Sequence, residues 1–429
     1  MTIALLFVSF FVLMLIGVPI ALSLGLASLI TMVFATDTST GVIIQKAFAS
    51  LDNFSLMAIP FFILAGVLMS SGGISKRLLH LAEVLIGFIA GGLAMVTVLA
   101  SMFFAAISGS GPATVAAIGS FMIPSMRDNK YSSGFAAAIT ASAGSIGVLI
   151  PPSIPFVMYG VVGSVSIGAM FLAGIIPGII LGFVLMVVSY ITAKRKGYKG
   201  TGEIPTFKDV LKAVNEAKFA LLIPVIILGG IYAGIFSPTE SAAVAAVYAL
   251  IIGVFVYKEL SWKTVYENFS QAALTNAATV IIISFSISFA YLMTRERIPV
   301  IIADFIISIS DNPIIIMLII NLFLLIVGMF IDTISAIVIL TPILLPVVTS
   351  FGINPIHFGV ILVMNLAIGF VTPPLGVNLF VASTVGKVRF ETIAKSMVPI
   401  LIAMIVALLI VIYFPPLSTG IPKLLSSKL

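Results

Sequence analysis

The sequence predicts an all-α polytopic membrane protein built from two related halves, each with a helical hairpin and a broken helix. Three observations predict this fold class: a composition suited to lipid, a repeat at fixed spacing, and helix breaks in matched pairs. The chain is 61% hydrophobic and only 8% charged, whereas a soluble domain carries about 25% charged residues. A spanning helix needs roughly 20 apolar residues, so the apolar material suffices for about ten to twelve spans.

Composition also excludes several classes of function. The 429 residues include no cysteine, which excludes disulfides, iron–sulfur clusters and thiolate metal sites. The net charge of +6 would fit a nucleic-acid partner, but the basic residues occupy short loops, where they mark the cytoplasmic side of a membrane protein. We therefore expect membrane lipid around the chain and no nucleic acid. The glycine-rich pieces do not match a phosphate-binding loop, which argues against ATP hydrolysis.

Apolar segments follow one another along the whole sequence. In order they are 3–35, 54–72, 78–107, 112–126, 131–163, 166–193, 219–257, 276–294, 298–330, 333–350, 355–385 and 398–416. The first and the seventh are long enough for one broken span or two short ones, and the sequence leaves both possibilities open. Two stretches, 41–53 and 258–272, mix charges with apolar residues at helical spacing and are expected to form helices at the membrane interface.

A basic segment, 194–218, separates a first repeat (1–193) from a second (219–429). It holds seven of the 21 basic residues, which predicts a cytoplasmic loop. When the sequence is shifted by 222 positions, four of the six prolines in 108–178 coincide with prolines, where chance predicts fewer than one. Internal repeats of this kind are typical of secondary transporters.

The loop charges favour an inverted second repeat. Arg127 and Lys130 follow the first hairpin, which indicates that this hairpin enters from the cytoplasm. The matching loop, 349–354, has no basic residue. Basic residues return only after the next crossing, at Lys387 and Arg389.

Two interrupted apolar segments, near 93–126 and 313–350, predict re-entrant helical hairpins. The first is interrupted by the run SGSGPAT from Ser108 to Thr114, and each arm of roughly 15 residues is too short to span. Non-helical backbone at membrane depth is tolerated where it lines a cavity or packs against protein. The second tip carries Asp332 between apolar runs, which indicates a functional site, although the same residue could simply cap the following helix.

Two Pro-Pro pairs, at 151–152 and 373–374, predict broken helices at 131–163 and 355–385. A simple kink is the alternative for a single proline, but breaks in matched pairs favour an interruption in each helix. The unwound residues before each pair would expose carbonyls, which suit a hard cation such as sodium. Half-helix N-termini suit an anionic substrate, and we expect them near residues 112, 151, 333 and 373.

These motifs resemble the large membrane subunit of tripartite ATP-independent periplasmic (TRAP) transporters. The resemblance rests on 105–114 (AAISGSGPAT), 147–153 (GVLIPPS) and 369–374 (GFVTPP), and it extends over essentially the whole chain. It implies an ion-transporter-superfamily fold with two inverted repeats and two re-entrant hairpins, in which a transport domain moves like an elevator. It also implies a multi-pass protein of the bacterial inner membrane.

The resemblance further implies sodium-coupled import of an organic acid that a soluble periplasmic binding protein delivers. The residues around the SGSGPAT motif of the first hairpin look most similar to those of family members that transport sialic acid. The resemblance therefore favours sialic acid as the substrate, with a C4-dicarboxylate next. A small four-helix membrane subunit is the other implied partner, and we expect it to be a separate chain because the first residues already fit the large-subunit pattern. No enzymatic activity is expected.

Each repeat is expected to form one sodium site, and the substrate is expected to lie between the repeats. The first sodium site would use Ser108, Ser110, Gly147, Val148 and Ile150. The second would use Gly328, Asp332, Thr333, Gly369 and Thr372. The substrate would contact Ser110, Thr114, Ser153, Asp332, Ser335 and Asn378.

Three other functions remain to be weighed against this one. The first is a stand-alone sodium–carboxylate symporter of the same superfamily, which needs no binding protein. The second is an intramembrane enzyme, for which the sequence offers no catalytic constellation. The third is a structural subunit that never binds substrate. Among single residues, Glu240 is interpreted as a helix-start acid and Arg295 as a cytoplasmic anchor, the alternatives being a proton carrier and a substrate ligand.

Overall fold

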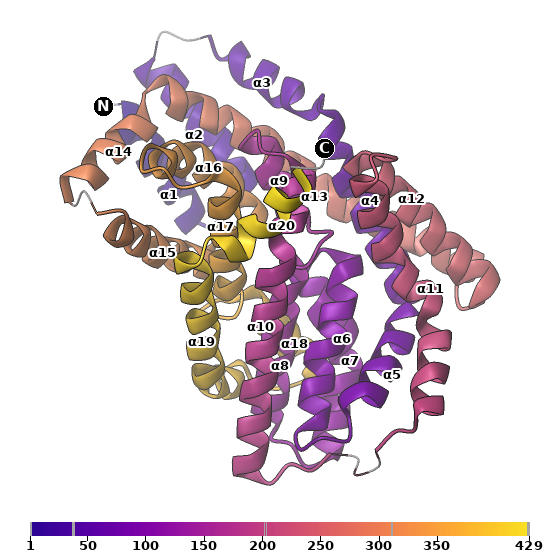
Figure 1. Ribbon diagram of the computed structural model, residues 1–429. Helices are drawn as coiled ribbons and strands as arrows, with labels where there is room; N and C mark the ends of the chain where they lie inside the picture. Colours follow the sequence, from indigo (N-terminus) through magenta and orange to yellow (C-terminus); the bar gives the residue numbers. More distant parts are fainter. Residues whose placement is uncertain (1, 37–38, 201, 203, 310–311, 427–429) are drawn as a thin grey trace.

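The computed structural model describes residues 2–36, 39–200, 202, 204–309 and 312–426. In these residues the regular structure is helical (Figure 1). Eight helices of the described chain are long and apolar enough to cross a membrane, and shorter apolar helices lie among them. The all-α polytopic class predicted from composition is therefore confirmed.

The 222-residue repeat reappears in the helix boundaries. The first hairpin and broken helix are α6 (Gly92–Ser108), α7 (Gly111–Asp128), α8 (Ser133–Ser145) and α9 (Ile154–Val162). Their counterparts are α15 (Pro313–Phe330), α16 (Thr333–Ser350), α17 (Pro355–Gly369) and α18 (Val377–Gly386). A shift of 222 positions reproduces both ends of the second hairpin arm, α7 and α16, and places Pro124 of α7 on Pro346 of α16.

Two hydrogen bonds show that the repeats are inverted. Near the end of α9, the Tyr159 hydroxyl donates to the carbonyl of Pro355 at the start of α17, at 2.6 Å. At the opposite end of the molecule, Arg127 before α8 donates through Nη1 to the carbonyl of Gly386 at the end of α18, at 3.2 Å. The two broken helices therefore run in opposite directions, as the loop charges predict.

The basic segment 194–218 is mostly helical, which corrects the prediction of a loop. Helix α10 (Ile167–Lys196) continues through its basic end to Gly197, whose φ of +72° closes it. Helix α11 (Phe207–Tyr232) begins early because Thr206 and Asp209 form a capping box. The connection runs from 197 to 206, and most of the basic residues lie at the adjoining ends of the two helices; the cytoplasmic position of this end stays a prediction.

The two long apolar segments whose crossings were left open each form two helices. The first gives α1 (Thr2–Leu15) and α2 (Ile20–Ala35), and the other gives α11 and α12 (Pro238–Ile251) with a π-helical extension, η3 (Ile252–Val256). In α12, the Glu240 carboxylate accepts from the Ser237 amide at 2.8 Å, so this residue is a capping acid. The remaining elements are η1 (Phe54–Met57), α4 (Ala58–Ser71), α5 (Ile74–Ile86), η2 (Ile146–Val148), α14 (Ile298–Ile309), α19 (Phe390–Tyr413) and α20 (Pro416–Ser426).

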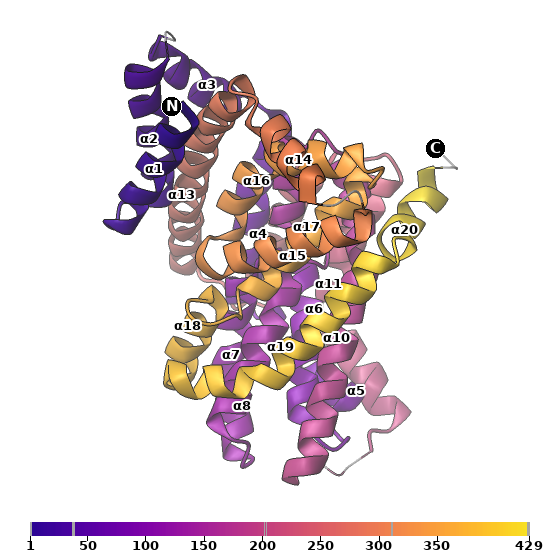
Figure 2. The same cartoon turned by 90° about the vertical axis from the view of Figure 1, so that its left-hand side faces the viewer.

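The stretch 258–272 does not form a separate interfacial helix. It leads into α13 (Trp262–Arg295), which is continuous for 34 residues and stands beside α1 and α2 in Figure 2. In the first half the corresponding chain is divided into α3 (Gly41–Leu51) and α4, because the polar run at 52–53 breaks it. Arg295 ends α13 far from the basic corner where this helix begins, so the interpretation of Arg295 as a cytoplasmic anchor conflicts with a cytoplasmic position for that corner.

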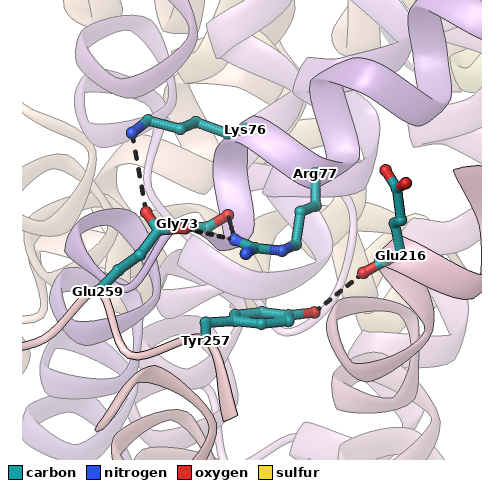
Figure 3. A network of polar contacts seen from close by, with 6 residues as sticks. All are labelled: Gly73, Lys76, Arg77, Glu216, Tyr257 and Glu259. Atoms are coloured by element: carbon teal, nitrogen blue, oxygen red, sulfur yellow. Dashed lines mark hydrogen bonds and ion pairs between the residues drawn. The ribbon is translucent and has the colours of Figure 1, made fainter.

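A polar network fixes this corner (Figure 3). Arg77 at the start of α5 donates through Nη1 to Glu259 at 2.7 Å and to the Gly73 carbonyl at 2.8 Å. Its guanidinium lies 3.6 Å from the centre of the Tyr257 ring, and the Tyr257 hydroxyl donates to the Glu216 carbonyl at 3.3 Å. Arg77 thereby joins α5 to the α12–α13 connection. Tyr257, which lies in that connection, joins it to α11.

Arg77→Ala is expected to lower the stability of the purified protein by about 1–2 kcal/mol, since it removes a stacked cation and a charged hydrogen bond. Lys76→Ala is the matched control: Lys76 lies 3.7 Å from Glu259 and its side chain is 63% exposed, so its loss should cost at most about 0.5 kcal/mol. Thermal unfolding in detergent measures both. Equal shifts for the two variants would contradict the role given to Arg77.

Candidate substrate and cation site

Three oxygen atoms converge at the tip of the first hairpin. Helix α6 ends at Gly109, whose φ of +59° suits glycine, and Ser110 caps α7. The Ser108 hydroxyl lies 3.0 Å from the Thr114 hydroxyl and 3.4 Å from the Ser110 carbonyl. The Thr114 hydroxyl donates to that carbonyl at 2.8 Å. These oxygens form a small triangle.

The first broken helix packs directly against this triangle. A Cβ atom on Gly147 would lie 2.6 Å from the Thr114 hydroxyl and 2.7 Å from the Ser110 carbonyl, so only glycine allows this approach. The carbonyl of Gly109 accepts from the amide of Ile154 at 3.4 Å. Tip and break, which lie about 40 residues apart in sequence, thus pack directly against each other, and a shared cation site there stays a prediction.

The second hairpin tip carries an anionic cap. Asp332 precedes α16, and its Oδ1 accepts from the amides of Ile334 at 3.0 Å and Ser335 at 3.1 Å. The hydroxyl of Ser335 donates to the other carboxylate oxygen. Asp332 occupies the repeat position of Ser110, so the two tips differ by one charge at equivalent places. The interpretation of Asp332 as a helix cap is confirmed. A functional role for Asp332 stays open, because the capping residue lies at the hairpin tip.

The second broken helix approaches its own hairpin through two glycines. A Cβ atom on Gly369 would lie 2.3–2.5 Å from three backbone atoms of Gly328. The nearby Thr372 hydroxyl donates to the Ile368 carbonyl at 2.8 Å. Thr333 differs, since its buried hydroxyl oxygen has no hydrogen-bond partner and thus has free capacity for a ligand.

The half-helices after the breaks begin later than predicted. Helix α9 starts at Ile154 rather than at residue 151, because Ser153 is its cap and accepts from the Phe156 amide at 3.3 Å. Helix α18 starts at Val377 rather than at 373, after Gly376 with φ of +52°. The Pro-Pro pairs, both cis, therefore lie within the breaks and not in the first helical turns.

A cavity of about 170 Å³ lies between the two hairpin tips. Four predicted site residues line it: Ser110, Val148, Asp332 and Thr333. The sequence analysis missed the other lining residues, which are mostly apolar or glycine: Gly109, Gly111, Pro112, Ile154, Pro155, Ile334, Phe370 and Val377. In the sequence, only their closeness to the motifs indicated that they line the cavity. Where a helix is interrupted, the directions of the side chains do not follow the helical period, so the pattern of residues cannot predict them.

The other predicted residues lie behind this lining. Ser108, Thr114, Gly147, Gly328 and Gly369 form the two tip-to-break contacts described above, and Ser335 binds Asp332. Ile150 packs toward α10 near Gly178. Ser153 donates to the Val148 carbonyl at 2.6 Å, which leaves it facing its own loop.

Asn378 links the two repeats and is fully buried. Its amide donates to the Ala141 carbonyl at 3.1 Å and to the Ser145 hydroxyl at 3.3 Å, both on α8. The structure therefore places Asn378 and Ser153, like Thr114 and Ser335, outside the residues that line this cavity, and their contact with substrate stays a prediction.

The chemistry of the site is that of hydroxyls, carbonyls, one carboxylate and helix N-termini. Such oxygen donors suit a hard cation, and the orphaned Thr333 hydroxyl and the oxygen triangle at the first tip fit one. Within the described chain, no group of three His, Asp or Glu side chains is placed to hold a metal ion. The donor set of the site is therefore suited to small ions and polar groups.

The hairpin tips and broken helices of two inverted repeats meet around one cavity, and this arrangement defines a membrane protein of inverted-repeat architecture. A solved structure of the same kind, the YdaH transporter of Alcanivorax borkumensis, matches with a TM-score of 0.66 over 87% of each chain at 13% identity, and so supports the fold. Residues 7–417 match the family described as tripartite ATP-independent periplasmic transporter, DctM component. The chain belongs to this family, as its motifs suggest, and is a multi-pass protein of the bacterial inner membrane.

Three relatives show the range of the family. The chain is 52% identical to the isethionate TRAP transporter permease DctMQ of Oleidesulfovibrio alaskensis, over 96% of this chain and 65% of that protein. It is 42% identical to the C4-dicarboxylate large permease DctM of Vibrio cholerae, over 99% and 98%. It is 41% identical to the sialic acid large permease SiaM of the same organism, over 95% of each. The chain thus spans about two thirds of the first relative's length and nearly all of the others.

Proposed function

We propose that this permease imports a small organic acid together with sodium, by an elevator movement of the domain that holds the two tips. The observation that carries the proposal is the cavity between Ser110 and Asp332, to which both repeats contribute a hairpin tip and a broken helix. A transport role is further supported by the family, and the cation-suited oxygens at each tip support coupling to sodium.

The one-charge difference between the tips suggests how a substrate is oriented. Asp332 already offsets the positive end of α16, whereas the neutral Ser110 leaves the positive end of α7 available. An anionic group would therefore be drawn to the α7 side, and a hydroxyl would meet Asp332, because two carboxylates in contact would repel each other. Isethionate, which has a sulfonate at one end and a hydroxyl at the other, meets both conditions.

We therefore rank isethionate first among the substrates, on its chemistry and on the 52% identity to a permease named for it. Sialic acid, which the residues of the first hairpin motif favour, ranks second, and C4-dicarboxylates rank third. We also propose a soluble periplasmic binding protein that delivers the substrate and a small four-helix membrane subunit that accompanies this chain.

Uptake by proteoliposomes that contain both membrane subunits is expected to require a sodium gradient and a loaded binding protein. Isethionate, succinate and sialic acid are each supplied with a cognate binding protein, in sodium and in potassium buffer. Equal uptake in sodium-free buffer would refute sodium coupling. Uptake at full rate without any binding protein would instead support the stand-alone symporter.

A further inference from the structure

A second, larger cavity begins at the first hairpin tip and leads away from the site between the tips. Its volume is about 550 Å³, and it shares Ser110, Ile154 and Ile334 with the smaller cavity. One wall is the first hairpin, with Ser108 and Ser120. The other wall consists of residues of α4, α5 and α13.

The wall opposite the hairpin carries several polar side chains and, among its described residues, no charged one. Ser71 ends α4, Ser75 lies in the first turn of α5, and Gln271 and Thr275 lie one turn apart on the same face of α13. No Asp, Glu, Lys, Arg or His is among the residues that line the cavity in the described chain. An anion in this cavity would therefore find hydrogen-bond donors but no positively charged side chain.

One buried group on this wall and one behind it have no hydrogen-bond partner. The hydroxyl oxygen of Ser75, a residue only 3% exposed, is unpaired. Just behind the wall, Asn268 is 5% exposed and its amide nitrogen is unpaired, while its Oδ1 accepts from the Ser71 hydroxyl at 3.1 Å. An unsatisfied buried polar group costs roughly 1–3 kcal/mol, so a ligand with oxygen acceptors would be stabilised here.

One end of the larger cavity lies at the α4–α5 turn. Ser71 and Ser75 flank the α4–α5 turn, where Gly73 accepts from Arg77 in the corner network. That corner also holds the α12–α13 connection and Glu216 of α11 (Figure 3). Lys76 and Arg77 lie there, and Lys258 and Lys263 flank the start of α13; such positive residues are typical of the cytoplasmic side.

We propose that Ser71, Ser75, Gln271 and Thr275 form a second subsite, which receives the organic acid on the cytoplasmic side after it leaves the hairpin tips. The inference rests on the proposed transport function. Neutral hydroxyls and an amide bind carboxylate or sulfonate oxygens weakly enough for rapid release, whereas a lysine or arginine would retain them. In a selective pathway, each site must bind the ligand well enough for it to enter and weakly enough for it to leave, and several weak sites in succession meet both conditions.

The absence of cysteine from the chain makes the subsite testable by labelling. Thr275→Cys is reacted with a negatively charged, membrane-impermeant thiol reagent in inside-out vesicles that contain both membrane subunits. Isethionate, succinate and sialic acid are added in turn, and the transported acid is expected to slow labelling at least threefold. Lys263→Cys, at a side chain 87% exposed near the start of α13, should label at the same rate with or without the acid.

A cysteine at Val377, in the cavity between the tips, separates the two proposals. If an acid protects Val377→Cys but not Thr275→Cys, the cytoplasmic subsite is wrong and the proposed function stands. If no acid is transported and neither cysteine is protected, both are wrong. Protection at both positions supports both.

Rates provide a second readout. Thr275→Val keeps the shape but removes the hydroxyl, and should lower the maximal uptake rate about threefold to tenfold. The half-saturating concentration of loaded binding protein should not change, because delivery takes place on the other side. Thr275→Ser should restore the rate. A normal rate for Thr275→Val with unprotected Thr275→Cys would overturn the proposal.

Discussion

Asp332→Asn is expected to lower sodium-driven uptake at least tenfold while the protein still assembles and remains stable. Asparagine has nearly the same shape and caps helices as well as aspartate does, so the amides of Ile334 and Ser335 keep an acceptor. What is lost is the negative charge in the cavity between the tips. A carboxylate in such a position is costly and is typically retained for function.

Two further variants isolate the charge. Asp332→Ala removes both the charge and the cap, and should lower uptake as strongly and also stability by about 1 kcal/mol. Asn354→Asp makes the reverse exchange at the cap of α17, where Asn354 accepts from the Ile356 amide at 2.8 Å, away from the cavity. It should leave uptake unchanged. Normal uptake by Asp332→Asn would reduce this residue to a helix cap.

Gly369→Ala is expected to abolish uptake through a different cause, the separation of the second hairpin from its broken helix. The added carbon would lie 2.3–2.5 Å from backbone atoms of Gly328, which cannot rotate away as a flexible side chain could. The two backbones must therefore move apart, and the predicted second sodium site lies between them. The sodium concentration for half-maximal uptake should rise in any residual activity.

The equivalent glycine of the first repeat provides a second test variant, and a glycine with free space around it provides a control. Gly147→Ala would meet the Thr114 hydroxyl and the Ser110 carbonyl, so it should impair the first site in the same way. Gly229→Ala on α11 has nothing within 4 Å of the added carbon and should be neutral or slightly stabilising. If Gly369→Ala transports as well as Gly229→Ala, the close approach has no role in transport.

Most of the fold could be predicted because glycine and proline mark its breaks. The tip at 108–114 and the Pro-Pro pairs interrupt apolar runs that would otherwise span, and they recur at one spacing. The continuity of α13 was missed because the charges at 258–272 suggested an interfacial helix, although nothing in the sequence after Ser261 breaks the chain.

The site was predicted only where it depends on backbone. Ser110, Asp332 and the paired glycines follow from the tips and breaks themselves. Asn378 and Ser153 were assigned to substrate by type and proximity, but the direction of a side chain next to an unwound segment depends on tertiary packing. The same limit hid the apolar lining and the unpaired Ser75 and Asn268, whose positions follow from how α5 and α13 pack around the hairpin.

One cation-suited tip in each repeat has an electrical consequence. If each tip carries one sodium ion, a monoanion such as isethionate enters with one net positive charge, whereas a dianion enters with none. A membrane potential contributes about 2.3 kcal/mol per charge per 100 mV, which corresponds to roughly 40-fold accumulation. A voltage step applied to proteoliposomes would therefore drive uptake of the monoanion and leave that of the dianion unchanged, so that current alone separates the candidate substrates by charge.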